Sequence, residues 1–149
     1  MMAYLYLLLV ALLSLSATVS KAESVSVQCG ESKGWAYYFA GGLVPDDMEG
    51  FTEDGITGGK TTLVVNDEGE GDVLFVDASG QLGSAKEQGG RVLFLDASNG
   101  LNWLLIYPDG TMENYALNLA SMKAALWRNT VGNENVAKNS LFISDCFIK

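Results

Sequence analysis

The side chains of this sequence that could carry out chemistry are almost all carboxylates. The 149 residues include 18 Asp and Glu, 9 Lys and Arg and no histidine, so the formal net charge is -9. Without an imidazole, Ser-His-Asp and Cys-His nucleophiles, His-ligated zinc and histidine bases are excluded. The chain also lacks the clustered Lys and Arg that phosphate binding needs, so we do not expect a nucleic acid partner.

One pair of carboxylates lies in an internal repeat. Residues 73–79 (VLFVDAS) recur as VLFLDAS at 92–98, so Asp77 and Asp96 each end a similar apolar segment. An aspartate at this place favours a turn, because its carboxylate can accept a bond from the backbone two residues further on. The alternative is that Asp77 and Asp96 meet at one rim of a sheet, where they would bind a ligand or act as acid and base on a sugar.

The acidic loop 66–72 (NDEGEGD) is the second candidate. Oxygen ligands suited to calcium fall at places 1, 3, 5 and 12 of a calcium-loop frame, namely Asn66, Glu68, Glu70 and Asp77. The frame departs from the pattern, because its first ligand should be Asp and its last a bidentate Glu. We therefore expect a solvated acidic turn and no cofactor, with a cation site as the alternative.

Aromatic side chains form the third candidate. In 34–40 (GWAYYFA), the period-two alternation of a strand puts Trp35, Tyr37 and Phe39 on one face. Rings on a strand are typically buried, so we expect these three in the core. If they are exposed beside acidic side chains, the same face would suit a sugar or a cationic ligand.

These candidates need strands to position them. Short segments of β-branched and aromatic residues alternate with glycine-bearing turns, which is typical of all-β folds. We predict a single antiparallel meander of about eight strands that forms a barrel or sandwich. The expected strands are 34–40, 60–65, 72–77, 91–96, 102–107, 112–118, 122–129 and 139–146.

Three segments carry local predictions. Residues 107–111 (YPDGT) predict a tight turn, so 104–107 should pair antiparallel with 112–115. Residues 44–49 (VPDDME) predict one short helical turn, with proline and acids at its positive end. The segment 120–127 (ASMKAALW) contains good helix formers, but we predict a strand because its neighbours are strands.

Residues 1–22 predict a secretory signal peptide. The run 3–17 is almost wholly apolar, and small residues at Ser20 and Ala22 suit cleavage after Ala22. A membrane anchor is the competing interpretation, but spanning a bilayer needs about 20 apolar residues. Cleavage leaves one domain, 23–149, with no membrane span. Loss of Lys21 makes its net charge -10, and we expect it to be periplasmic or secreted.

The two cysteines, Cys29 and Cys146, lie near the ends of the mature chain. An even count in an exported chain indicates a disulfide, which here would clamp the first strand to the last. The alternative of a redox-active pair needs a C-x-x-C spacing that is absent.

Four short motifs are spread over most of the mature chain: Cys29, Gly34-Trp35-x-Tyr37-Tyr38, Asp54-Gly55-Ile56-x-x-Gly59 and Lys138-x-x-x-Phe142-x-x-x-Cys146. This outline resembles an uncharacterised group of small exported bacterial proteins, to which no activity is attached. In size, acidity, terminal disulfide and meander pattern the chain is also similar to periplasmic lysozyme-inhibitor barrels, as an analogy of fold.

Three functions from different classes follow. We rank first an exported, non-enzymatic binding domain whose barrel or sandwich face holds a small ligand or an envelope component. The second is an inhibitor or immunity-type protein, which its negative charge would steer onto a cationic enzyme. The third is a carboxylate-based hydrolase. The missing histidine favours binding over catalysis.

Overall fold

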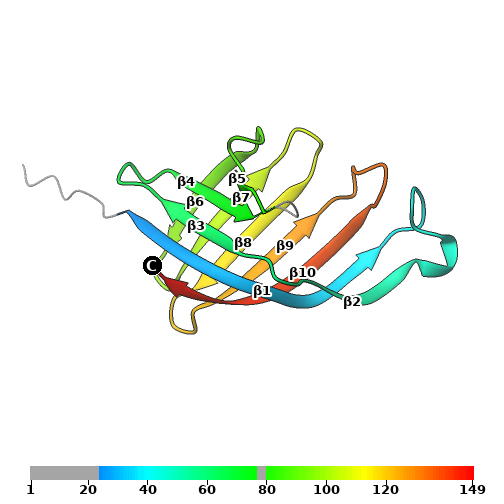
Figure 1. The fold of residues 1–149 in the computed structure, drawn as a ribbon, viewed down its shortest axis with the longest axis horizontal. Helices are drawn as coiled ribbons and strands as arrows, with labels where there is room; N and C mark the ends of the chain where they lie inside the picture. Colours follow the sequence, from blue (N-terminus) through cyan, green and yellow to red (C-terminus); the bar gives the residue numbers. More distant parts are fainter. Residues whose placement is uncertain (1–23, 77–79) are drawn as a thin grey trace, which may run out of the picture.

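The computed structural model describes residues 24–76 and 80–149, and their fold is all-β (Figure 1). Besides the short 3-10 helix η1 (Asp46–Met48), the elements are strands. These are β1 (Val25–Tyr38), β2 (Gly50–Ile56), β3 (Thr61–Val65), β4 (Gly71–Val76), β5 (Leu82–Ser84), β6 (Arg91–Ala97), β7 (Gly100–Ile106), β8 (Met112–Asn118), β9 (Lys123–Asn129) and β10 (Lys138–Ile148). The predicted signal peptide lies outside the described residues.

The strands form one curled antiparallel sheet, a half-barrel. Their order is β5-β4-β3-β1-β10-β9-β8-β7-β6, and β2 also pairs with β1. On either side of β1 the curl has an arm: β3, β4 and β5 form one, and β10, β9, β8, β7 and β6 form the other. Within each arm, strands that follow one another in the chain are neighbours. The first strand, β1, pairs with the last, β10, as expected of the predicted meander. Between β5 and β6 the described residues form no ladder, so the curl stays open along this side.

The long strand β1 belongs to two parts of the sheet. Its residues 25–29 pair with β3, and its residues 32–38 pair with β2. The register between β1 and β10 shifts between Cys29 and Ser32, and such a bulge bends a strand. Figure 1 shows the result: β1, β2 and β10 continue beyond the curl as an extension of the half-barrel.

The core lies where the two arms of the curl approach each other. Trp103 on β7 is fully buried, and its indole N–H donates to the backbone oxygen of Val64 on β3 over 3.0 Å. At Gly71 on β4, a Cβ atom would come within 2.9 Å of Trp103 and Phe94, so glycine permits this close approach. Other core residues are Val27, Leu63, Val73, Leu105, Leu117, Ala124, Leu126 and Phe142.

The predicted disulfide is confirmed. Cys29 and Cys146 are bonded and lie directly opposite each other on β1 and β10. The bond therefore joins the first strand to the last, across a sequence separation of 117 residues. No helix in the described part of the chain is long and apolar enough to cross a membrane.

The local predictions are confirmed where turn chemistry governs them. The turn after Tyr107 pairs Ile106 with Met112, and η1 is the short helical turn expected in 44–49. The segment 120–127, which contains good helix formers, is a strand from Lys123 onward, as predicted. A turn precedes the strand, and in it Met122 has a φ of 51°.

Residues 24–76 and 80–149 form ten strands, two more than the prediction. The sequence of β2, GFTEDGI, has neither apolar alternation nor β-branched enrichment, and pairing with β1 makes it a strand. β5 has only three residues. β1 begins at Val25, well before the predicted start at residue 34, because β3 and β10 pair with its first residues.

The prediction of a buried aromatic face was wrong. Trp35 is 54% exposed, whereas its neighbour Ala36 faces the inside of the curl and is buried. Tyr37 and Phe39 are half-buried. At Gly34 a Cβ atom would meet the backbone oxygen of Leu141 on the neighbouring strand, so glycine permits this close approach. Trp35 lies on the outer face of the single sheet, which no other described strand covers.

Candidate functional site

Two neighbouring strands build a charged pair in which the carboxylate is buried and the guanidinium is partly exposed. The alternation of β8 directs Glu113, Tyr115 and Leu117 to the inside of the curl. The β8–β9 register sets Glu113 directly opposite Arg128. Period-two geometry and antiparallel pairing thus bring a carboxylate, a guanidinium and a phenol together on one face.

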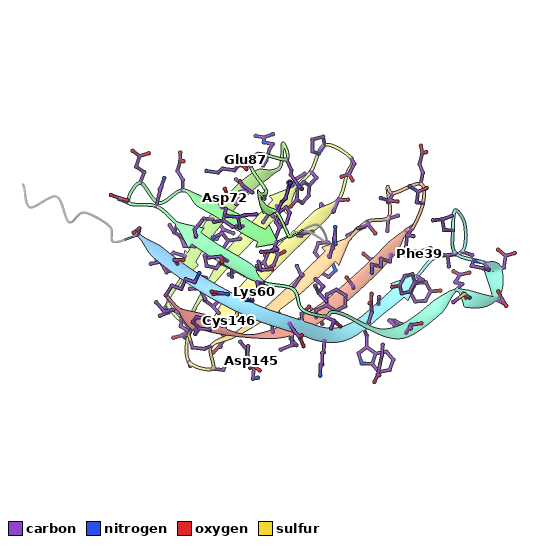
Figure 2. All side chains as sticks on the ribbon, in the orientation of Figure 1. Phe39, Lys60, Asp72, Glu87, Asp145 and Cys146 are labelled. Atoms are coloured by element: carbon purple, nitrogen blue, oxygen red, sulfur yellow. A yellow bond between two sulfur atoms is a disulfide. The ribbon has the colours of Figure 1, made fainter. Side chains whose placement is uncertain are left out.

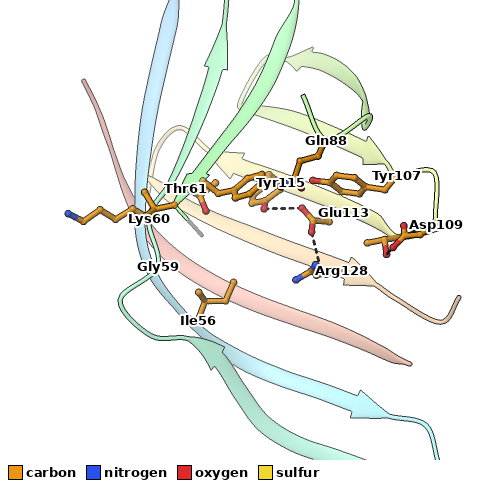
Figure 3. Close-up of a pocket in the computed structure, with 13 residues that line it drawn as sticks. Ile56, Gly59, Lys60, Thr61, Gln88, Tyr107, Asp109, Glu113, Tyr115 and Arg128 are labelled. Carbon is orange, nitrogen blue, oxygen red and sulfur yellow. Dashed lines mark hydrogen bonds and ion pairs between the residues drawn. The ribbon is translucent and has the colours of Figure 1, made fainter. Parts of the chain in front are cut away.

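Glu113 contacts both of these neighbours (Figure 3). Its Oε1 lies 2.9 Å from Nε of Arg128, in an ion pair that lacks hydrogen-bond geometry at Nε. Its Oε2 accepts a hydrogen bond of 3.1 Å from the Tyr115 hydroxyl. Glu113 is only 6% exposed. Burying a charge is costly unless it is paired, and these two contacts offset that cost.

The surroundings shift the acidities of three residues. Burial raises the pKa of Glu113, although Arg128 and the Tyr115 hydroxyl act in the opposite direction. Burial also raises the pKa of Tyr115 well above its usual value, and the charge of Glu113 adds to this effect. Burial, followed by the charge of Glu113, raises the pKa of Tyr107 to about 12. Such clusters of shifted groups mark candidate functional sites.

These residues line a cavity of about 300 Å³ at the open part of the curl. Both arms contribute to its wall, and Figure 3 shows the ammonium of Lys60 directed away from the other labelled side chains. The lining mixes apolar, hydroxyl and charged side chains: Ile56, Lys60, Thr61, Phe75, Val76, Gln88, Tyr107, Asp109, Thr111, Glu113, Tyr115 and Arg128, with Gly59.

The rim of the cavity is held by the predicted hairpin turn. The carboxylate of Asp109 accepts bonds from the backbone N–H of Thr111 over 2.9 Å and from its hydroxyl over 3.1 Å. The backbone bond is the main reason that the pKa of Asp109 is lowered. The carboxylate thus maintains the turn and positions Tyr107, whose backbone N–H donates to the oxygen of Thr111.

A second polar cluster lies in the extension, formed by Tyr38, Asp54 and Lys138. Oδ2 of Asp54 accepts bonds from Nζ of Lys138 over 2.7 Å and from the Tyr38 hydroxyl over 2.8 Å. Partial burial opposes ionisation of Asp54, but these bonds outweigh it and lower its pKa. The cluster joins β1, β2 and β10, and its three residues come from three of the four short sequence motifs.

Only one member of the predicted carboxylate pair lies within the described residues, so the pairing of Asp77 with Asp96 stays a prediction. Asp96 is exposed near the end of β6. Asp77 lies outside the described residues. The described parts of the two repeats, 73–76 and 92–97, lie in β4 and β6, on opposite arms of the curl.

The acidic loop is organised as a turn. The side-chain oxygen of Asn66 accepts bonds from the backbone N–H groups of Glu68 and Glu70, over 3.0 and 2.8 Å. Glu70 also forms an ion pair with Lys86 on the neighbouring loop. In residues 24–76 and 80–149, no three Cys, Asp or Glu side chains are grouped so that they could hold a metal ion.

Two of the three predicted aromatic residues, Tyr37 and Phe39, come together in the extension, while Trp35 makes no ring contact with them. The ring of Tyr37 lies 5.0 Å from that of Phe39 and 5.1 Å from that of Phe51, both edge to face. Figure 2 shows Phe39 near the connection from β1 to β2. Phe51, which the sequence analysis did not select, is 76% exposed.

Sequence reasoning missed Glu113 and Arg128. A signal was present: in MENYALN, a glutamate shares the period-two face of Tyr115 and Leu117, which is the apolar face of the strand. A charge on such a face requires a partner. The identity of that partner depends on the β8–β9 register, which no local pattern specifies.

Comparisons of the chain with protein-family models, curated proteins and solved structures gave no match.

Proposed function

We propose that this protein is an exported, non-enzymatic binding protein whose cavity holds a small, uncharged, hydroxylated ligand. The observation that supports this most directly is the buried carboxylate of Glu113, which contacts the partly exposed Arg128 and the Tyr115 hydroxyl at the wall of the cavity. Burial of the Glu113 carboxylate is costly, and pairing with a partly exposed guanidinium gives little net stability, so stability alone gives little reason for a charge at this position. Pockets of about 300 Å³ are at the small end of those that bind ligands.

The charges of the lining favour an uncharged ligand. The cations Lys60 and Arg128 are balanced by the anions Asp109 and Glu113. Arg128 already pairs with Glu113, and Asp109 is engaged in its own turn. A ligand with a net charge would therefore meet no unpaired opposite charge here, apart from Lys60, which is directed away.

The other lining groups suit a ring that carries hydroxyl groups. Tyr107, Tyr115 and Thr61 supply phenol and hydroxyl groups, while Phe75 and Ile56 supply apolar surface. Sugars and other polyols have both kinds of surface, with polar edges and apolar C–H faces. Export would account for the disulfide, because such bonds persist in oxidising compartments.

Titration with three sugars of matched size tests this function. We expect D-glucose at millimolar concentration to shift the amide NMR signals of Thr111, Glu113 and Arg128, and the charged analogues glucuronate and glucosamine to bind more weakly. Tyr107→Phe should weaken glucose binding, whereas Tyr38→Phe, a matched change in the extension, should not. The proposal is overturned if neither glucose nor myo-inositol shifts these signals, or if a charged analogue binds best.

A further inference from the structure

An exposed apolar surface covers the outer face of the extension. We define the outer aromatic surface by Trp35, Tyr37, Phe51 and Leu141. Trp35 pairs with Leu141 across β1 and β10, and Tyr37 pairs with Phe51 across β1 and β2, so the four lie in two adjacent rows. Trp35 is 54%, Leu141 52% and Phe51 76% exposed.

The described chain does not use this surface for its own folding. The side chains that alternate with Trp35 and Leu141, such as Ala36, Ser140 and Phe142, are buried on the other face of the same strands. Trp127 and Ile143, both exposed, extend the apolar area across β9 and β10. Contiguous exposed apolar surface bordered by polar residues typically marks an interaction site.

The border of this surface is acidic. Residues 46–59 contain five acidic side chains and no basic one. Glu53 lies directly opposite Trp35, and Glu49 accepts a hydrogen bond of 3.1 Å from the Tyr37 hydroxyl. Asp54 faces inward to Lys138, so it does not contribute to this border.

A groove beside Trp35 gives the surface a shape suited to an extended chain. It has a volume of about 490 Å³ and follows the β1–β2 pairing. Its lining includes Trp35, Glu31, Glu53 and a single cation, Lys33. An Arg or Lys side chain lying over exposed rings is attracted by their quadrupoles, and nearby carboxylates can pair with its charge.

Two kinds of partner could cover this surface, a second copy of the chain or a different protein, and charge favours one of them. A second copy of this chain would bring the same acidic border and the same net negative charge, and like charges at an interface are unfavourable. A basic polypeptide would find apolar, aromatic and acidic groups together.

We propose that the outer aromatic surface docks an extended basic segment of a partner protein. This site is independent of the cavity, because it lies on the opposite face of the sheet, so either proposal can fail alone.

Fluorescence titration with a synthetic peptide of alternating Arg and Val provides the test. Trp35 and Trp127 are exposed while Trp103 is buried, so we expect the emission to change on binding. Trp35→Ala should weaken binding about tenfold, as is typical of an aromatic anchor. Glu53→Gln should weaken binding less and reduce its salt dependence. Raising the ionic strength from about 0.01 to 0.15 M should also weaken binding, because the screening length falls.

Controls distinguish this site from general attraction between opposite charges. Leu82→Ser removes an equally exposed apolar side chain on β5, outside the surface, and should leave affinity unchanged. A peptide of alternating Glu and Val should not bind. Circular dichroism would establish that Trp35→Ala is folded, and Phe51→Ser serves as a second surface variant. Equal affinity of the Arg-Val peptide for the unaltered protein and both surface variants overturns the proposal. So does a dimer that Trp35→Ala abolishes.

Discussion

Trp103 and Trp35 lie on opposite faces of one sheet. Trp103 faces the inside of the curl, donates a hydrogen bond to Val64 on the opposite arm and is fully buried. Trp35 faces outward from the extension and is more than half exposed. The same inner face that buries Trp103 also holds Glu113 with Arg128, and Asp54 with Lys138.

The comparison shows that residue type does not decide which face of this sheet is covered. An apolar side chain is buried only where a second layer lies opposite it, and here the opposite arm of the curl supplies that layer. In the extension the inner face holds the polar cluster of Tyr38, Asp54 and Lys138 beside the small, buried Ala36, whereas the outer face carries exposed aromatic side chains. Four predictions test this difference, from the largest expected effect to the smallest.

Truncation of the two tryptophans should separate the faces most clearly. We expect Trp103→Ala to lower the free energy of unfolding by about 3–5 kcal/mol, because it leaves a large cavity between the arms. Trp35→Ala should change it by no more than about 0.5 kcal/mol, as is typical of exposed positions. Urea unfolding followed by circular dichroism measures both. Similar losses for the two variants would contradict the comparison.

Removal of the disulfide, which lies on the inner face, should lower the free energy of unfolding of the whole domain. Replacing Cys29 and Cys146 together by Ser should cost about 2–5 kcal/mol, because the loop it closes is long. Thermal unfolding of the double variant and of the reduced wild-type protein should agree with each other. If neither differs from the oxidised protein, the clamp between β1 and β10 is not needed to hold the curl.

Glu113 should make stability depend on pH, with a smaller effect. Burial raises its pKa in the folded protein, so between its ordinary value and the raised one the folded state holds more protons than the unfolded state. In that window stability falls as the pH rises. Relative to the wild type, Glu113→Gln should therefore become more stable as the pH rises through this window. A stability difference that stays constant with pH in urea titrations would contradict this prediction.

The smallest expected difference is between two ion pairs, Asp54–Lys138 on the inner face and Asp145–Lys123 on the outer face, in what each contributes to the free energy of unfolding. Asp54 and Lys138 are mostly buried on the inner face, whereas Asp145 and Lys123 are exposed on the outer face, where Figure 2 shows Asp145 outside the curl. Asp54→Asn should cost about 1 kcal/mol, and Asp145→Asn less than about 0.5 kcal/mol.

The pH dependence of this pair gives a further check. The pKa of Asp54 is lowered on folding, so its contribution is present above the ordinary value of about 3.9 and is lost as the pH falls through the folded value. The difference between Asp54→Asn and the wild type should therefore vanish in acid. Unfolding measured at pH values on both sides of this window would show whether it does.

Local signals accounted for part of the candidate sites. The turn chemistry of YPDGT predicted the hairpin that carries Tyr107 to the rim of the cavity, and the alternation in 34–40 correctly grouped Tyr37 with Phe39. The same alternation could not say which face was buried, because both faces of a strand obey the same period. Pairing of Glu113 with Arg128 depends on a register between strands, which is not a local property.

The sequence by itself determined the all-β class, the meander and the bond between Cys29 and Cys146. Strand propensity, turn residues and an even cysteine count are short-range or compositional signals, and they are readable without coordinates. Only the tertiary structure decided that the curl leaves one side open, places a charged pair at a cavity and turns Trp35 outward. These outcomes depend on how the two arms pack against each other, because a side chain is buried only where another part of the fold covers it.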